Sequence, residues 1–261
     1  KHINYLCIWN SLSEKVIKMF IPNSIKNFLI KSFSKNKTFF TSYSQAREDV
    51  MLKYLFRKYL YKKYKGFYID IGAFDPTKGS NTKYLYNCGW SGLNIDANPT
   101  SIEKFNLYRK RDINLHIGIS ERSSEKPFFY FGKNDGINSF SESFIKKNKT
   151  AKNVEKILQV QTETLSSVLD LHLPNKQTID LMDIDVEGLD FEVVKSNDWK
   201  KYRPKILMIE LEAKYFKDIL NHEISQYLSK QNFEPFYRTI IIGDISTVFF
   251  IDLEIEEDFF Y

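Results

Sequence analysis

Two segments in the first half of the chain combine an apolar run with residues that could hold a nucleotide-type cofactor. Residues 66–76, GFYIDIGAFDP, form a compact β-rich run ended by Gly72, and residues 92–99, GLNIDANP, form a second run ended by Asp96. In doubly wound α/β folds, an acidic residue about 20 residues after such a glycine hydrogen-bonds a ribose. The spacing therefore predicts a ribose-binding carboxylate at Asp96.

The residues after Gly72 indicate which cofactor carries that ribose. A dinucleotide needs a G-x-G-x-x-G sequence to seat its pyrophosphate on a helix N-terminus, whereas here Ala73, Phe74, Asp75 and Pro76 follow Gly72. S-adenosylmethionine (SAM) carries an adenosine ribose and a cationic methionine end but no phosphate. The pattern therefore favours SAM as the cofactor and methyl transfer as the chemistry.

Ligands of open α/β sheets bind beyond the carboxyl ends of the strands, so the residues there are the cofactor candidates. We expect Asp70 or a neighbouring amide to face the methionine ammonium, and Asp96 to accept hydrogen bonds from both ribose hydroxyls. Asn98 would shape the adenosine pocket, and Gly118 would line the adenine. Gln45 could equally be a helix cap. The full expected set is Gln45, Asp70, Gly72, Ala73, Asn81, Asp96, Asn98, Gly118 and Asp183.

Acidic residues alternate through the sequence DIDVEG. Asp183, Asp185 and Glu187 would repel one another at neutral pH without a cation, a proton or a basic neighbour. Glu210 ends the next apolar run, so we expect Asp185 and Glu210 to bind a divalent metal, Mn²⁺ or Mg²⁺, or to act as a base, with Glu187 steadying that catalytic site. The sulfonium and ammonium of SAM are alternative partners, and a purely structural role stays open.

Six blocks occur in order between residues 44 and 212: SQAREDV, GFYIDIGAFDP, SNTKYLYNCGWSGLNIDANP, TETL, DIDVEGLDFEVV and RPKILMIELE. Together they resemble the FkbM family of SAM-dependent methyltransferases. The resemblance does not cover the outer segments of the chain. It implies O-methylation of small molecules and glycans, in natural-product and surface-polysaccharide pathways.

From that resemblance we expect a SAM-dependent O-methyltransferase acting on a sugar hydroxyl. The leading acceptor is a nucleotide-linked sugar for capsule or lipopolysaccharide synthesis, with Lys133, Lys146 and Lys147 available for its phosphates. Two alternatives stay open. One is a catalytically silent scaffold in a glycan-synthesis complex, and the other is a nucleotide-sugar oxidoreductase, which the missing pyrophosphate glycines disfavour.

An α/β fold must position these residues. Strands are expected at residues 67–71, 93–95, 115–119, 179–184 and 205–211, with a closing hairpin at residues 233–241 and 247–253. Helices are expected from an N-cap at Ser44 and at residues 219–229. The order predicts a Rossmann-like class I methyltransferase fold with a mostly parallel seven-stranded sheet. Residues 126–164 interrupt the alternation of strands and helices and are interpreted as an insertion that forms a substrate lid.

The composition agrees with an enzyme that has one catalytic domain. The chain has 261 residues, of which 43% are hydrophobic, enough to bury a core. Its net charge of +5 arises from 38 basic against 33 acidic residues spread along the sequence, which disfavours nucleic acid as a partner. No run approaches the roughly 18 apolar residues of a transmembrane helix. The two cysteines are too few for a disulfide framework, so we expect a cytoplasmic location.

The beginning of the chain does not fit the catalytic pattern. We expect residues 1–43 to be a helical N-terminal extension and residues 44–261 to be the methyltransferase domain. The extension would pack on the domain or on a second subunit, which leaves a homodimer open. Binding to a membrane surface through its lysines is the alternative.

Overall fold

The computed structural model describes residues 41–132, 136, 138–147 and 154–255. All of its described helices and strands lie in one compact unit, Ser42–Tyr261. We expected a helical extension in residues 1–43, and residues 1–40 of it lie outside the described residues. None of the helices in the described part is long and apolar enough to cross a membrane.

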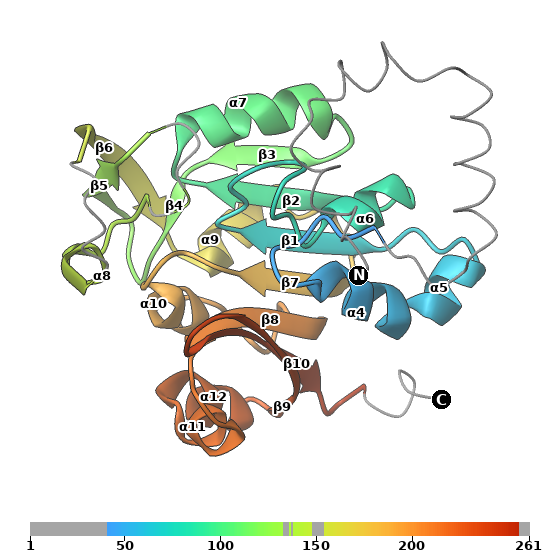
Figure 1. Ribbon diagram of the computed structural model, residues 1–261. Helices are drawn as coiled ribbons and strands as arrows, with labels where there is room; N and C mark the ends of the chain where they lie inside the picture. Colours follow the sequence, from blue (N-terminus) through green and yellow to red (C-terminus); the bar gives the residue numbers. More distant parts are fainter. Residues whose placement is uncertain (1–40, 133–135, 137, 148–153, 256–261) are drawn as a thin grey trace, which may run out of the picture. The chain divides into compact units, whose positions relative to one another are not determined.

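A seven-stranded sheet forms the centre of this unit, in the order β3-β2-β1-β7-β8-β10-β9 (Figure 1). Neighbouring strands from β3 to β8 pair in parallel, and β10 pairs antiparallel with both β8 and β9. The bounds are β1 (Phe67–Ile71), β2 (Ser91–Asp96), β3 (Ile113–His116), β7 (Ile179–Ile184), β8 (Pro204–Glu212), β9 (Phe233–Ile242) and β10 (Ile245–Asp252). The expected mostly parallel sheet with a C-terminal antiparallel hairpin is confirmed.

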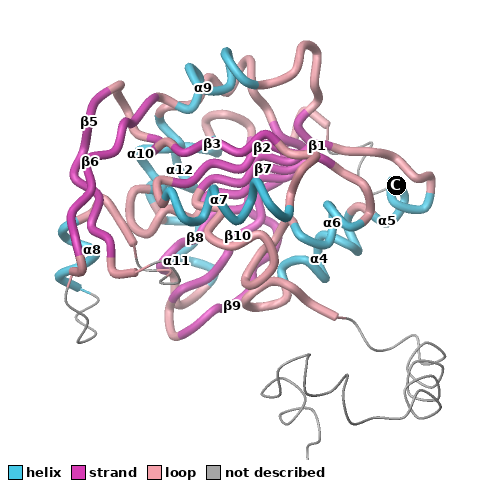
Figure 2. Tube along the Cα trace, turned by 90° about the horizontal axis from the view of Figure 1, so that it is seen from above, coloured by secondary structure: helices cyan, strands magenta, loops and turns pink. Residues whose placement is uncertain are grey.

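Helices cover both faces of this sheet, with α9 on one side and α4 and α6 on the other (Figure 2). One apolar cluster joins the sheet to α9, α10 and α12, and a second joins it to α4 and α6. The bounds are α4 (Glu48–Leu55), α5 (Arg57–Tyr61), α6 (Lys83–Asn87), α7 (Pro99–Tyr108), α9 (Leu165–His172), α10 (Asp190–Lys195), α11 (Phe216–Asn221) and α12 (Glu223–Ser229).

The covering of both faces explains the sequences of the central strands. Every residue of β1 and β7 is buried, which is why both read as continuous apolar runs rather than as alternating ones. Three acids interrupt these runs: Asp70, Asp180 and Asp183. Asp180 is compensated at the start of its strand by Lys205, whose Nζ lies 2.7 Å from the carboxylate. Asp70 and Asp183 lie toward the carboxyl ends, where the candidate site is built.

The expected single strand at residues 115–119 is wrong, because the chain changes sheets there. β3 ends at His116, and the Ile117 amide donates to the Asp96 carbonyl at 3.2 Å. β4 (Gly118–Ile119) then pairs with β6 (Lys156–Glu163) in a separate sheet of three strands, whose third member is β5 (Ser124–Tyr130). Most of β5, α8 (Glu142–Lys147) and β6 fall within residues 126–164, which are called the insertion below, whereas β4 precedes that range.

Two helix boundaries also differ from expectation. α4 begins at Glu48 rather than after Ser44, because Arg47 adopts a left-handed conformation with φ of 70°. Ser44 still serves as a cap from outside the helix, since its Oγ accepts from the Asp49 amide at 2.9 Å. The expected helix at residues 219–229 is split into α11 and α12 by an extended backbone at His222.

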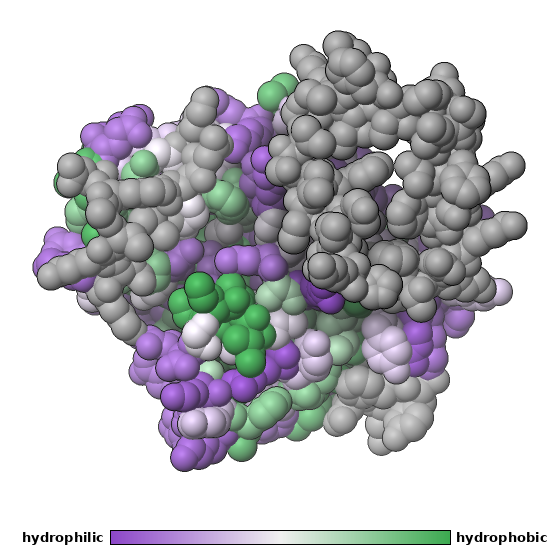
Figure 3. Space-filling model, viewed as in Figure 1, coloured by the Kyte–Doolittle hydropathy of each residue, from purple (hydrophilic) through white to green (hydrophobic). Residues whose placement is uncertain are grey.

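The β9–β10 hairpin turns at the same edge of the sheet as the carboxyl ends of the parallel strands. Figure 3 shows apolar side chains gathered on the surface over this hairpin, where Ile240 and Ile242 are 56% and 70% exposed. β9 is the terminal strand of the sheet order. Its last residues therefore present an apolar surface to solvent at that edge.

Candidate active site

A cavity of about 510 Å³ lies at the carboxyl ends of β1, β2 and β7, bounded on one side by the insertion. Cavities of this size are typical of small-molecule and cofactor sites. All nine expected cofactor-binding residues line it, together with Asp185 and Glu187. Glu210 does not line the cavity, but its carboxylate lies beside those of Asp185 and Glu187. The structure thus brings the expected residues to one place.

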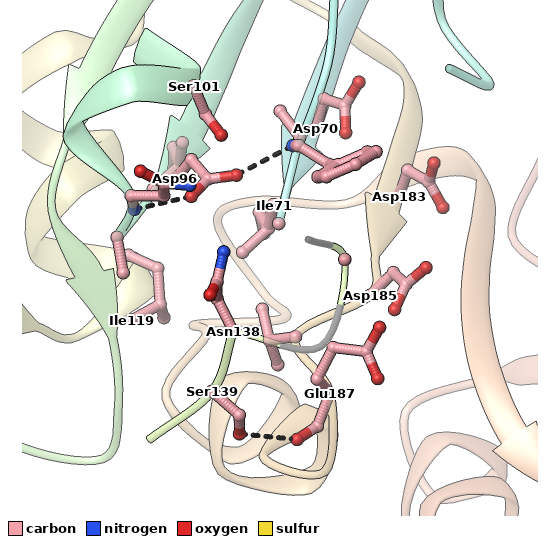
Figure 4. A pocket seen from close by; sticks show the side chains of 18 of the residues that line it. Asp70, Ile71, Asp96, Ser101, Ile119, Asn138, Ser139, Asp183, Asp185 and Glu187 are labelled. Atoms are coloured by element: carbon pink, nitrogen blue, oxygen red, sulfur yellow. Dashed lines mark hydrogen bonds between the residues drawn. The ribbon is translucent and has the colours of Figure 1, made fainter. Parts of the chain in front are cut away.

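Asp96 lies at the end of β2 and points into this cavity (Figure 4). Its two carboxylate oxygens accept hydrogen bonds from the Phe74 amide at 2.7 Å and the Asn98 amide at 2.6 Å. Burial raises the pKa of Asp96 to about 6, although these two amides oppose the shift. A carboxylate oxygen has more than one acceptor position, so Asp96 can still accept from the two hydroxyls of a ribose.

Helix α7 starts directly after this carboxylate. Asn98 caps it by accepting from the Thr100 amide at 3.0 Å, and Pro99 occupies the first helical turn, where its missing amide hydrogen costs nothing. Asn98 Nδ2 and Ser101 Oγ are buried and have no hydrogen-bond partner among the described residues. Two such orphaned polar atoms beside a ribose acid fit the adenosine part of SAM.

Asp70 and Asp183 are partners in register on the adjacent strands β1 and β7. Asp70 accepts from Thr82 Oγ1 at 2.7 Å, and Asp183 accepts from Asn81 Nδ2 at 2.8 Å. Burial raises the pKa of Asp70 to about 6, and burial together with the charge of Asp70 raises the pKa of Asp183 well above its usual value. Two crowded acids in a cavity favour a cationic ligand, such as the methionine ammonium of SAM.

A second group of acids lies where β7 and β8 end. Asp185, Glu187 and Glu210 each place one carboxylate oxygen within 4.8 Å of the others. Burial and the neighbouring Glu187 raise the pKa of Glu210 to about 8, and burial and Glu210 raise the pKa of Asp185 well above its usual value. Asp185 Oδ1 is buried without a hydrogen-bond partner in the described part of the chain. Three carboxylates that can each offer an oxygen ligand, one of them with an oxygen that lacks a hydrogen bond, fit a hard divalent cation.

The loop that carries Asp185 and Glu187 has a defined shape. Asp190, at the start of α10, accepts from the Val186 amide at 3.0 Å and from the Gly188 amide at 3.2 Å. Glu187 has a positive φ of 55° and Gly188 one of 96°. The turn after β7 therefore sends Glu187 away from a strand path and still brings its carboxylate back to Asp185.

Reasoning from the sequence missed several lining residues. Four of them belong to the insertion, which carried no local motif, and the fifth is a serine in the first turn of the helix after the ribose acid. They are Ser101, Phe128, Asn138, Ser139 and Phe140. Of the lysines expected to meet phosphates, Lys146 pairs with Glu142 on the exposed face of α8, whereas Lys133 and the side chain of Lys147 lie outside the described residues.

A buried arginine that the sequence did not reveal supports the loop after β1. Arg109 is fully buried and donates to the Pro76 carbonyl, Ser80 Oγ and Tyr68 Oη, each at 2.9 Å. The loop that these bonds hold carries Asn81, the partner of Asp183. Arg109 thus positions one wall of the cavity from outside it.

The strand order, with an acid at the end of the second strand and a glycine after the first, is that of a Rossmann-like class I methyltransferase fold. The family model of the methyltransferase FkbM domain matches residues 70–235, which is more than half of the chain. The chain therefore belongs to the FkbM methyltransferase family, and SAM is its cofactor. The resemblance inferred from the six sequence blocks is confirmed.

Solved structures with related folds include the methyltransferase FkbM from Methylobacillus flagellatus, with a TM-score of 0.44 and 10% identity over 72% of this chain. This chain spans only 43% of that protein. The 1,6-didemethyltoxoflavin-N1-methyltransferase of Burkholderia thailandensis has a TM-score of 0.40 and 10% identity, covering 87% of each chain. A TehB-like SAM-dependent methyltransferase from Corynebacterium glutamicum has a TM-score of 0.40 and 12% identity over 89% of this chain and 100% of that one. No curated protein sequence matches the chain.

Proposed function

We propose that this protein transfers the methyl group of SAM to a hydroxyl of a small-molecule acceptor. A sugar hydroxyl is the leading acceptor, on a nucleotide-linked sugar for surface-polysaccharide synthesis, as the family resemblance suggests. The observation that carries the proposal is the gathering of Asp185, Glu187 and Glu210 beside the cavity that Asp96 lines. A hydroxyl is a weak acid, and the three clustered carboxylates can help to remove its proton.

The cofactor half of the cavity requires little chemistry from the protein. SAM, when bound, supplies a methyl group already activated by its positive sulfur. Asp96 would hold the ribose, while Asp70 and Asp183 would attract the methionine ammonium. Removing water and fixing the angle between acceptor, methyl and sulfur would supply most of the rate enhancement.

Asp185, which lines the cavity, or Glu210 beside it is the proposed base, because a general base must lie within reach of the acceptor hydroxyl. Burial raises the pKa of Glu210 to about 8, so its carboxylate form binds a proton more tightly than an ordinary glutamate does. Asp185 and Glu210 are also the proposed ligands of Mn²⁺ or Mg²⁺, with Glu187 completing the group. Such a cation, when bound, would lower the pKa of a coordinated hydroxyl. In either role these residues act on the acceptor rather than on SAM.

The insertion is proposed to form the wall and lid of the acceptor site, within a methyltransferase domain that spans residues 44–261. Five of its described residues line the cavity: Phe128, Gly136, Asn138, Ser139 and Phe140. Phe128 and Phe140 pack against each other with ring centroids 4.8 Å apart. A cavity lined by both aromatic rings and acids suits a ligand with an apolar face and polar hydroxyls, as a sugar has.

The test is transfer of radiolabelled methyl groups from SAM to a panel of nucleotide sugars, free sugars and catechols, with and without Mn²⁺. Label in a nucleotide sugar, stable to mild base as an ether is, supports the proposal. Label found only in a nitrogen or carbon acceptor would overturn the O-methylation. SAM binding with no transfer to any acceptor class would favour the scaffold.

A further inference from the structure

A part-buried hydrogen bond joins the insertion to the loop that carries Asp185 and Glu187. Ser139 Oγ donates to the backbone carbonyl of Glu187 at 2.8 Å, and Ser139 is 1% exposed (Figure 4). The two residues come from different parts of the chain, since Ser139 follows β5 and Glu187 follows β7. The bond therefore ties the wall of the cavity to the backbone of one of the three clustered acids.

Glu187 needs such a tie because its backbone conformation is unfavourable. Its φ of 55° lies in the left-handed region, which residues with a side chain adopt reluctantly. Asp190 fixes the amides on either side, those of Val186 and Gly188. The Glu187 carbonyl, which those two bonds do not hold, is the group that Ser139 binds. Strained residues persist at functional sites only where the surroundings hold them.

Ser139 is itself held in place. Its backbone amide and carbonyl both pair with Phe129 of β5, at 3.3 and 2.9 Å. Its hydroxyl oxygen accepts from the Ser141 amide at 2.9 Å, which directs the hydroxyl hydrogen toward Glu187. Beside it, Phe144 of α8 packs so closely on Gly188 that a Cβ there would lie 3.1 Å from the Phe144 Cβ. The insertion thus holds the loop at two adjacent residues.

We propose that Ser139 is a positioning residue that keeps the Glu187 carboxylate in reach of Asp185 and Glu210. The insertion then shapes the acidic group as well as lining the acceptor pocket. This inference rests on the proposed cation site. It assigns Ser139 a role through Glu187 and no contact with the reacting atoms.

The test measures Mn²⁺ binding by calorimetry to chelator-treated wild type, Ser139→Ala, Ser139→Thr and Ser143→Ala. Ser139→Ala should weaken Mn²⁺ binding by about tenfold or more, the usual effect of removing a group that orients a metal ligand. Ser139→Thr keeps the hydroxyl and should restore most of the affinity. Ser143, an exposed residue of α8, lies in the same insertion and bonds only Ser141 Oγ among the described residues, so Ser143→Ala should match wild type.

Two results would overturn the proposal, and they are distinguishable. If wild type binds Mn²⁺ and Glu187→Gln loses it while Ser139→Ala does not, the cation site stands and the positioning role fails. If wild type binds SAM but no Mn²⁺, both the cation site and the positioning role of Ser139 are refuted. Unfolding temperatures of all variants show whether a loss reflects the site or the fold.

Discussion

Gly72 and Asp185 approach so closely that no side chain fits between them. A Cβ on Gly72 would lie 1.7 Å from the Asp185 carbonyl oxygen, and Gly72 has a φ of +83°. The residue directly after β1 and the residue directly after β7 are therefore in close backbone contact. The glycine that the sequence indicates as a cofactor residue is thus also required for the packing of these two strands.

Replacement of Gly72 by alanine should destabilise the protein by about 2 kcal/mol or more, because both the contact and the positive φ oppose a side chain. Urea denaturation measures the change in the free energy of unfolding. Gly243→Ala is the matched control, since Gly243 has a φ of +56° but a Cβ there would meet no atom within 4 Å among the described residues. Equal effects at the two positions would show that the contact with Asp185 contributes nothing.

Asp96→Ala should weaken SAM binding by about ten- to a hundredfold, the expected loss for hydrogen bonds to a charged acceptor. Calorimetric titration with SAM gives the affinity. Asp198→Ala serves as control, because Asp198 is exposed and does not line the cavity. Unchanged affinity in Asp96→Ala, with the fold intact, would refute the assignment of Asp96 to the ribose.

SAM affinity should depend on pH through the acids of the cofactor half. Burial raises the pKa of both Asp70 and Asp96 to about 6, so each carboxyl takes up a proton as the pH falls through 6. A cationic ligand favours the ionised forms and lowers their pKa, so binding must release protons near pH 6 and strengthen as the pH rises. Titrations from pH 5 to pH 8 should show the dissociation constant falling and then levelling above about pH 7. A flat profile would contradict the assignment.

The same raised pKa values give the stability of the unbound protein the opposite pH dependence to that of SAM affinity. A folded-state pKa of about 6, above the ordinary 3.8, means that the folded protein holds more protons than the unfolded chain between these values. These acids therefore stabilise the fold fully below about pH 3.8, and this contribution is lost as the pH rises through 6. SAM should raise the unfolding temperature more at pH 7.5 than at pH 5.5.

Asp185→Asn and Glu210→Gln should leave SAM affinity within a few-fold of wild type and lower methyl transfer by a hundredfold or more, about the contribution of general base catalysis. Glu212→Gln is the control on the same strand, since Glu212 is exposed and lies outside the clustered acids. Comparing binding with single-turnover transfer separates the two effects. Retained transfer in both active-site variants would remove the acids from the chemistry.

The central sheet and the cofactor half of the site were predictable because local patterns determine them. Residues 67–71 and 179–184 are strands with the expected bounds, since continuous apolar runs mark strands covered on both faces. The acids at or near the carboxyl ends of the strands follow from the rule for parallel sheets. The break at Ile117 was not predicted, because the alternating apolar residues Leu115, Ile117 and Ile119 suggest one strand, whereas the chain passes there from one sheet to another.

Long-range partners account for most of what the sequence did not reveal. Ser139 and Asn138 carry no motif, and only the return of the insertion to β7 brings them to the cavity. Arg109 looks like an exposed basic residue in the sequence, yet the structure buries it completely. Its place depends on the backbone and hydroxyl groups of a loop far away in the chain, which no local pattern encodes.

The most direct test titrates chelator-treated protein with SAM and with NAD by calorimetry, and repeats the SAM titration with Mn²⁺ present. We predict selective binding of SAM, and a further Mn²⁺-dependent heat that disappears in Asp185→Asn and Glu210→Gln. Binding of NAD alone, or of neither compound, would contradict the account.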